Sequence, residues 1–262
     1  MKKSLLPVLI LIVMTTPVAI FGDEWTKKFA LTGKAELRVE TDDGDVRVTV
    51  GSGPAIEAQV HTAGWRISPD EVRVTDRQSG NRVEIEVKIP KQHWNGGHRS
   101  VRIELTVPRE TDSEIRTGDG NVSIEDVKGG TRLSTGDGNV EARSLEGTFE
   151  ATTGDGNIRV AGRFDQLNLK TGDGEIAAEV GPGSKMSSEW SVRTGDGNVV
   201  LRLPKDFSAE LDAHTGDGDI DLNFPITVAG SLKGSSIRGK INGGGPTLTV
   251  RTGDGSIRLE QF

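Results

Sequence analysis

The stretch at residues 115–124 reads Ile-Arg-Thr-Gly-Asp-Gly-Asn-Val-Ser-Ile, and it decides the fold of the chain. Its central tetrapeptide, Thr-Gly-Asp-Gly, occurs seven times, starting at residues 117, 135, 153, 171, 194, 215 and 252. The first four copies start 18 residues apart, and the later gaps are 23, 21 and 37 residues. A fixed period of this kind is typical of solenoids and other repeat arrays. Because the last gap is close to two periods, we expect a degenerate coil within residues 234–245.

Apolar residues flank every copy at the same three positions, two before the threonine and five and seven after it. In chain order these positions hold Ile115, Val122, Ile124, Leu133, Val140, Ala142, Ala151, Ile158, Val160, Leu169, Ile176, Ala178, Val192, Val199, Leu201, Ala213, Ile220, Leu222, Val250, Ile257 and Leu259. Alternate residues of a strand face the same side, so the pattern predicts a strand, a turn and a second strand in each repeat. The motif threonines share this inward parity, and we expect them to form an internal ladder.

The Gly-Asp-Gly segment is expected to be a turn. Glycine adopts positive φ without steric cost, and aspartate tolerates left-handed conformations. Neighbouring strands lie about 4.8 Å apart, so identical turns would stack above one another at that spacing. A second turn per coil is expected at residues 128–130 and 145–147. A left-handed hexapeptide helix fails because the six-residue step from Val122 reaches Lys128. A β-roll with two nine-residue units matches in part, and an antiparallel meander stays open.

The region before the first full copy contains an altered repeat. Residues 37–48 fit the template with Asp42 in place of the first glycine. Residues 83–87 and 101–107 alternate between apolar and polar, and we expect an antiparallel hairpin joined by the loop at residues 93–98. No segment has a convincing helical period, so helix should be scarce.

The N-terminus reads as an export signal. Lys2 and Lys3 precede an apolar stretch that is interrupted by Pro7 and Pro17, and cleavage is expected after Gly22. An uncleaved membrane anchor is the alternative. Cleavage moves the formal net charge from −7 to −9, which argues against nucleic acid and anionic lipid as partners. The chain has no cysteine, so disulfides, thiolate metal sites and a cysteine lipid anchor are excluded. The expected division is residues 1–22 as signal peptide, 23–110 as an N-terminal β region or cap, and 111–262 as the repeat solenoid.

The mature chain resembles the DUF4097 family, the bacterial "putative adhesin" group of β-strand repeat proteins. The resemblance rests on the N-terminal β region, on Leu-Thr-Val-Pro-Arg at residues 105–109, and on the serial Thr-Gly-Asp-Gly-Asn-Val/Ile units. It implies an all-β, right-handed β-helix-like solenoid and a cell-envelope location. It carries no defined site residues.

The motif aspartates are the sharpest candidate site, and they are Asp119, Asp137, Asp155, Asp173, Asp196, Asp217 and Asp254. Two charges about 4.8 Å apart repel by roughly 1 kcal/mol in water. The first interpretation is a structural turn, in which basic residues one position before the threonine neutralise the row. These are Arg116, Lys170, Arg193, His214 and Arg251. Calcium, which prefers oxygen ligands, is the alternative cofactor, and direct ligand contact is the third.

Other candidate contacts are fewer. The loop at residues 93–98 holds His93, Trp94 and His98 and reads as a polar hairpin tip, with a metal or sugar contact as the alternative. Trp65 and Trp190 would close the ends or seams of a thin core, or stack on glycans. No nucleophile elbow, zinc-protease motif or phosphate loop is present in the sequence.

The sequence therefore predicts a non-catalytic protein that is exported to the periplasm, cell surface or medium. The expected role is adhesin-like, structural or interactive, with an envelope or extracellular protein or glycan as partner and no membrane insertion after cleavage. A glycan- or calcium-binding module is the alternative, and a polysaccharide-active β-helix enzyme a distant one. Because the chain stops right after the last copy, we expect an uncapped end there and either an end-on partner or an end-to-end oligomer.

Overall fold

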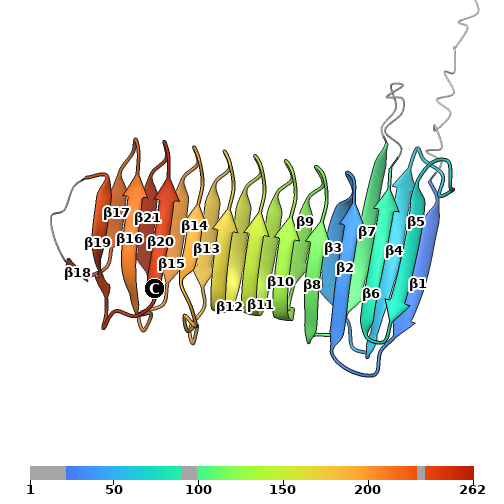
Figure 1. Ribbon diagram of the computed structural model, residues 1–262, viewed down its shortest axis with the longest axis horizontal. Coiled ribbons are helices and arrows are strands. Elements are labelled where there is room, and N and C mark those ends of the chain that lie inside the picture. Colours follow the sequence, from blue (N-terminus) through green and yellow to red (C-terminus); the bar gives the residue numbers. More distant parts are fainter. Residues whose placement is uncertain (1–21, 90–98, 229–233) are drawn as a thin grey trace, which may run out of the picture.

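The structure is a computed structural model that describes residues 22–89, 99–228 and 234–262. All regular structure in these ranges is β, and Figure 1 shows one elongated stack of strands. No helix in the described part of the chain is long and apolar enough to cross a membrane. Residues 1–21 of the predicted signal (residues 1–22) and the loop at residues 93–98 lie outside the described ranges.

The strands form two faces that meet at the Thr-Gly-Asp-Gly corners. The pre-corner face contains the strands that enter a corner, together with the strands that pair alongside them. In spatial order these are β5 (Arg73–Ser79), β6 (Arg82–Lys88), β2 (Ala35–Thr41), β8 (Thr111–Arg116), β10 (Lys128–Ser134), the second halves of β11 (Val140–Thr152) and β12 (Ile158–Lys170), β14 (Trp190–Arg193), β20 (Thr247–Thr252), β16 (Ala209–Thr215), β19 (Ser236–Ile241) and β18 (Ile226–Val228).

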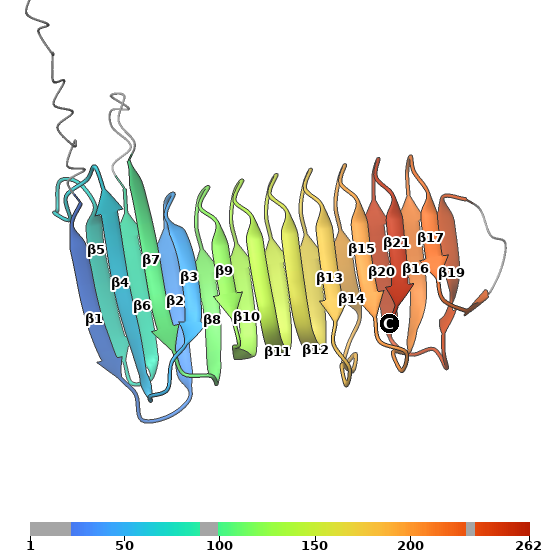
Figure 2. The same ribbon diagram turned by 180° about the vertical axis from the view of Figure 1, so that it is seen from behind.

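The post-corner face contains the strands that leave a corner, together with the strands that pair alongside them. Their spatial order is β1 (Glu24–Ala30), β4 (Ala55–Ala63), β7 (Ser100–Val107), β3 (Asp45–Val50), β9 (Val122–Glu125), the first halves of β11 and β12, β13 (Ile176–Val180), β15 (Val199–Leu203), β21 (Ile257–Gln261) and β17 (Ile220–Asn223). The corners follow one edge of the stack, the upper edge in Figure 1 and in the reverse view of Figure 2.

The repeat strands pair in parallel, which makes the array a solenoid-like stack. Val140 pairs with Val122 on one side and with Ile158 on the other, 18 residues away in each direction. The antiparallel meander is therefore excluded for the repeats. Strands β11 and β12 bend around the second edge, where β11 shifts register between Ala142 and Leu145. In the first coil the second turn lies at Asp126–Val127, just before the predicted position, and Asp126 has a positive φ.

Two coils lie out of chain order, one near each end. The altered repeat β2–β3 lies between β6–β7 and β8–β9, and the last repeat β20–β21 lies between β14–β15 and β16–β17. The prediction that the chain ends in an uncapped last coil is therefore wrong. The predicted degenerate coil is also wrong, because residues 236–241 form β19, which pairs antiparallel with β16. The chain doubles back through β18 and β19 and then inserts its last coil.

The predicted hairpin of residues 83–87 and 101–107 is likewise wrong. Strand β6 pairs with β2 and β5, whereas β7 pairs with β3 and β4, and the two strands lie on opposite faces. Alternation is the same for a hairpin strand and for one coil of a solenoid, so the sequence pattern could not separate them.

The core confirms the inward pattern. Nineteen of the 21 flanking apolar residues are buried, and the two exceptions, Ile220 and Leu222, are half-buried on edge strand β17. An aromatic row runs inside the C-terminal half through Phe149, Phe164 and Trp190, with ring centroids 6.2 and 6.5 Å apart. Trp190 is 1% exposed, which confirms its place in the core.

Candidate functional site

The corner threonines form the predicted internal ladder. The Thr135 hydroxyl donates to the Gly120 carbonyl at 2.9 Å and accepts the Gly138 N–H at 3.3 Å. Equivalent donations run from Thr117, Thr153, Thr171, Thr194, Thr215 and Thr252 to the last glycine of the adjacent corner. Thr117 donates to Gly44, so the altered repeat is part of the same ladder. The threonine therefore joins each corner to its neighbour.

The motif glycines are required by close stacking rather than by left-handed backbone. A Cβ on Gly138 would lie 2.0 Å from the Gly120 carbonyl oxygen, and one on Gly136 would lie 2.6 Å from that of Gly118. Among the motif glycines only Gly218 has φ in the positive region, and no motif aspartate does. The expected turn chemistry is therefore wrong. The corner excludes a side chain because the next backbone lies where that side chain would begin.

A second ladder, which the sequence analysis missed, follows the motif on the outside. The Asn121 side-chain oxygen accepts the Asn139 backbone N–H at 3.0 Å, and Asn139 accepts that of Asn157 in the same way. The Asn198 side-chain oxygen likewise accepts the Ser256 backbone N–H at 2.9 Å. The signal was asparagine directly after four of the motif copies. An amide there satisfies a corner N–H that regular strand pairing leaves free.

All seven motif aspartates are exposed. None of their carboxylates has a hydrogen bond or ion pair within the described residues. The ion pair of Arg116 is with Glu114 at 2.7 Å, and that of Arg251 is with Asp212 at 2.7 Å. No ion pair within the described residues joins these basic residues to a motif aspartate, so neutralisation of the aspartate row by them stays a prediction. Within the described ranges no three His, Asp or Glu side chains are grouped as metal ligands.

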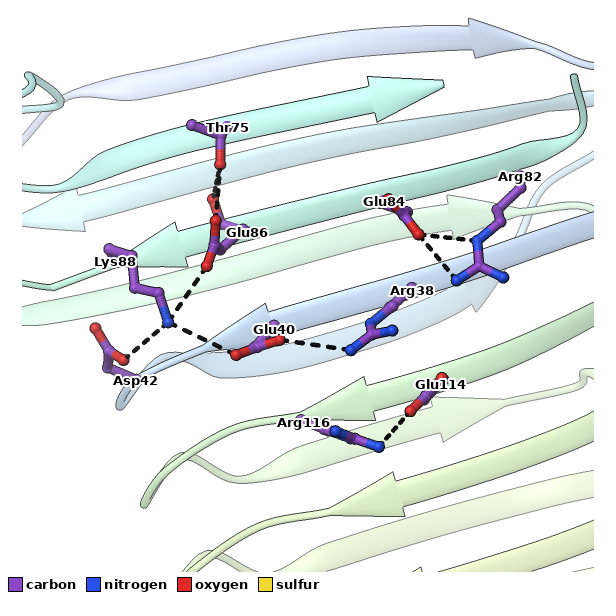
Figure 3. Close-up of polar contacts among 10 residues, drawn as sticks. All are labelled: Arg38, Glu40, Asp42, Thr75, Arg82, Glu84, Glu86, Lys88, Glu114 and Arg116. Carbon is purple, nitrogen blue, oxygen red and sulfur yellow. Dashed lines mark hydrogen bonds and ion pairs between the residues drawn. The ribbon is translucent and has the colours of Figure 1, made fainter. Parts of the chain in front are cut away.

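The basic residues instead belong to outward rows on the pre-corner face. Near the N-terminal end these rows are charge-compensated, as Figure 3 shows. The Lys88 ammonium lies 3.4 Å from Glu86, 3.6 Å from Glu40 and 3.6 Å from Asp42. Desolvation lowers the pKa of Lys88, but the charges of Asp42, Glu86 and Glu40 and the Glu86 hydrogen bond outweigh it and raise that pKa. Arg82 similarly lies 2.9 Å from Glu84.

Asp112 on β8 is part of the same compensated region. Its carboxylate accepts a hydrogen bond from Lys34 and another from the Gly130 N–H at 2.7 Å. Desolvation raises the pKa of Asp112, but these two donors outweigh it and hold that pKa below its ordinary value. Asp112 also lines a groove of about 390 Å³ over β2, β8, β10 and β11, where Gly130 has no side chain to fill the surface.

Further along the same face, like charges are stacked instead. Lys170 is paired in register with Arg193, Arg193 with Arg251, and Arg251 with His214. We call these four residues the basic row. Lys170, Arg193 and His214 are exposed, and none of the three has an ion pair or hydrogen bond from its side chain in the described structure. Opposed like charges destabilise a sheet, so the fold alone does not account for this row.

The basic row has a neutral polar row beside it. Two residues earlier on the same strands stand Asn168, Ser191 and Thr249, followed by Asp212. The side chains of the first three are partly exposed and have no hydrogen bond to described residues. Charged donors and free hydroxyl or amide groups therefore lie side by side on a rigid surface. Trp65, the other tryptophan singled out in the sequence, is partly buried and has the Arg99 guanidinium 4.3 Å from its ring centroid.

Comparisons with solved structures find distant likenesses. One is to a "putative cell adhesion protein" from Clostridium sporogenes, with 16% identity, a TM-score of 0.46, and coverage of 92% of this chain and 100% of the other. Another is to a "putative adhesin" from Bacteroides fragilis, with 13% identity, a TM-score of 0.49, and coverage of 90% and 97%. A third is to a "putative lipid binding protein" from Parabacteroides distasonis, with 13% identity, a TM-score of 0.41, and coverage of 90% and 96%.

No curated protein matches the chain. The Toastrack DUF4097 family model, in contrast, matches residues 35–162 and again residues 130–260. The two matches overlap in the central repeats, and together they cover nearly all of the described strands. The chain belongs to the Toastrack DUF4097 family.

Proposed function

We propose that this protein is a non-catalytic, adhesin-like interaction protein of the cell envelope or the medium. The observation that carries the proposal is the outward surface of the stack. Charged and polar side chains stand in rows on hydrogen-bonded strands, and the inward side chains pack into a mainly apolar core. Such a surface is pre-organised, so a partner would bind without ordering it first.

The non-enzymatic part of the proposal rests on two features. The sequence has none of the catalytic motifs considered above, and the 18-residue register leaves little loop to build a substrate cleft. Two of the grooves on the sheet faces, one over β2, β8 and β10 and one over β3, β4 and β7, are open and have mainly polar linings. A polysaccharide-active β-helix enzyme remains the distant alternative, and turnover of acidic or neutral polysaccharides by the purified protein would establish it.

The location is inferred from the N-terminal sequence. Residues 1–22 have the charged start and apolar stretch of an export signal. A right-handed coil, and the division into an N-terminal β region or cap of residues 23–110 and a repeat solenoid of residues 111–262, also remain predictions. Strands from both of these parts share the two faces, with β2 pairing to β8 and β3 to β9.

Fractionation of the native host with mass spectrometry of the mature protein tests the proposal. We expect a mature N-terminus at Asp23, recovery from the envelope or medium, and retention of protein-coated beads on whole cells or their matrix. A full-length cytoplasmic protein, or beads that are retained no better than beads coated with an unrelated acidic protein, would contradict it.

A calcium-binding module is the second candidate, and the exposed, unpaired aspartate row favours it. Calcium between adjacent corners would offset their mutual repulsion. If calcium binds there, an excess of chelator lowers the melting temperature and Asp137→Asn reduces the effect. An unchanged melting temperature removes the candidate.

An end-to-end oligomer remains part of the proposal. The inward residues of β17, Ile220 and Leu222, are half-buried, and β17 pairs with β21 alone among the described strands. Edge strands with a free side favour pairing with another chain. Light scattering over a concentration series tests this, and a strictly monomeric protein at high concentration would contradict it.

A further inference from the structure

We propose that the basic row on β12, β14, β20 and β16 binds an acidic polysaccharide, a linear glycan with one carboxylate per sugar or per few sugars. The proposal rests on the interaction role above and adds the site and the class of partner. The row consists of Lys170, Arg193, Arg251 and His214, stacked in register across three strand intervals, about 14 Å in all.

The charge arrangement is the first argument. Elsewhere on the same face opposite charges are neighbours, as in the contacts of Lys88 with Glu40 and Glu86. In the basic row the neighbours are alike, and within it only Arg251 has an acidic partner, Asp212. Two guanidinium groups and an ammonium held on a rigid ladder match carboxylates spaced along an extended polymer. Arginine also binds a carboxylate with two parallel hydrogen bonds.

The surroundings of the row favour a glycan over other polyanions. On one side Asn168, Ser191 and Thr249 offer hydrogen-bonding groups without an internal partner, which suit sugar hydroxyls. The motif aspartates follow three residues after the row on the other side, and the whole chain is acidic. This field opposes a dense polyphosphate more than a sparsely charged glycan. The only ring in the row is the small imidazole of His214, and the row has no Phe, Tyr or Trp on which successive bases would stack.

The out-of-order coil completes the row. Strand β20 is inserted between β14 and β16, which places Arg251 between Arg193 and His214. Without that insertion the row would lose its central guanidinium.

The test is isothermal titration of the full mature chain with oligogalacturonate of defined length. The fully methyl-esterified oligomer of the same length is the ligand control, because it keeps the sugar backbone and removes the charge. The site variant is Lys170→Gln with Arg193→Gln. The matched protein control is Arg47→Gln with Arg159→Gln, which removes the same charge from two exposed, unpaired arginines of the post-corner face.

We expect oligogalacturonate to bind, the methyl ester to bind at least tenfold more weakly, and added salt to weaken binding. The site variant should lose at least tenfold in affinity, with a melting temperature at or above that of the unmodified protein, and the control variant should lose less than twofold in affinity. No binding, equal binding of the ester, or equal losses in both variants would overturn the proposal. So would tighter binding of duplex DNA or of vesicles containing anionic lipid. If oligogalacturonate fails while coated beads are still retained on the native envelope, only this inference falls, because the bead assay tests the interaction role separately.

Discussion

The pre-corner face has two halves that follow one template and use charge in opposite ways. Around β6, β2 and β8 the outward rows mix acids and bases, so that Lys88 contacts three carboxylates and Arg116 lies against Glu114. From β12 to β16 the equivalent row stacks Lys170, Arg193 and Arg251. The inward residues are apolar in both halves. The fold therefore constrains the inward positions and the corners, and it leaves the outward rows available for function.

The largest expected effect tests whether the corners are really alike in the two halves. Gly120→Ala in the first half and Gly255→Ala in the second each place a Cβ 2.1 Å from a carbonyl oxygen of the adjacent corner. Because both clashes are with backbone, we expect each variant to lose about 3 kcal/mol in the free energy of unfolding. Urea denaturation measures this.

The control for the corners is Gly53→Ala, where an added Cβ has no atom within 4 Å, and it should stay within about 0.5 kcal/mol of the unmodified protein. A loss of stability in only one of the two glycine variants would show that the corners of the two halves differ, and the two halves would then not follow one template.

Two charge-reversal variants, one in each half, test the difference in charge balance and should have effects of intermediate size on stability. Arg193→Glu creates opposite charges beside Lys170 and Arg251 and should stabilise the fold by about 0.5 kcal/mol. Lys88→Glu places a fourth acid among Glu40, Asp42 and Glu86 and should destabilise it by a similar amount. Thermal and urea unfolding at low salt measure both changes. Effects of the same sign would mean that the two halves do not differ in charge balance, and high salt should reduce both effects.

The smallest expected effect is the pH dependence of the stability that Asp112 contributes. Asp112 has a pKa below its ordinary value of 3.8, so its contacts with Lys34 and Gly130 stabilise the fold above that pH. This contribution is lost as pH falls through the lower, folded-state pKa. Asp112→Asn should therefore reduce stability at pH 7 and make little difference at pH 2. Asp70→Asn, at an exposed loop position without a side-chain partner, is the control. A deficit of the same size at both pH values would contradict the assignment.

Much of the fold was predictable from the repeat itself. The spacing of the motif, the inward apolar positions and the buried threonines are local properties that recur in every copy, and the structure agrees with them. The altered copy at Thr41 was recognisable for the same reason. The hairpin of residues 83–107 was not, because alternation records which face is buried and not which strand lies alongside.

The candidate site was only partly predictable. The basic residues before the motif threonines were visible in sequence, but they were assigned to the aspartates of their own corners. Their side chains stand on the sheet face, where the register places Lys170 beside Arg193. The glycines were recognised in the sequence, but they were explained by positive φ, which was the wrong cause. The true cause is a clash with the neighbouring coil, as at Gly138, and a pattern within one repeat does not show which backbone lies next to it.

The sequence by itself determined the repeat, the all-β class, the inward residues and the corner composition, because each depends on the alternation of side chains along one strand. Only the tertiary structure decided the order of the coils. Strands β20 and β21 could extend the stack or enter it, and hydrogen bonding to β14 and β16 on both sides of β20 satisfies both of its edges. That choice, made by long-range pairing, brings Arg251 between Arg193 and His214 and completes the basic row.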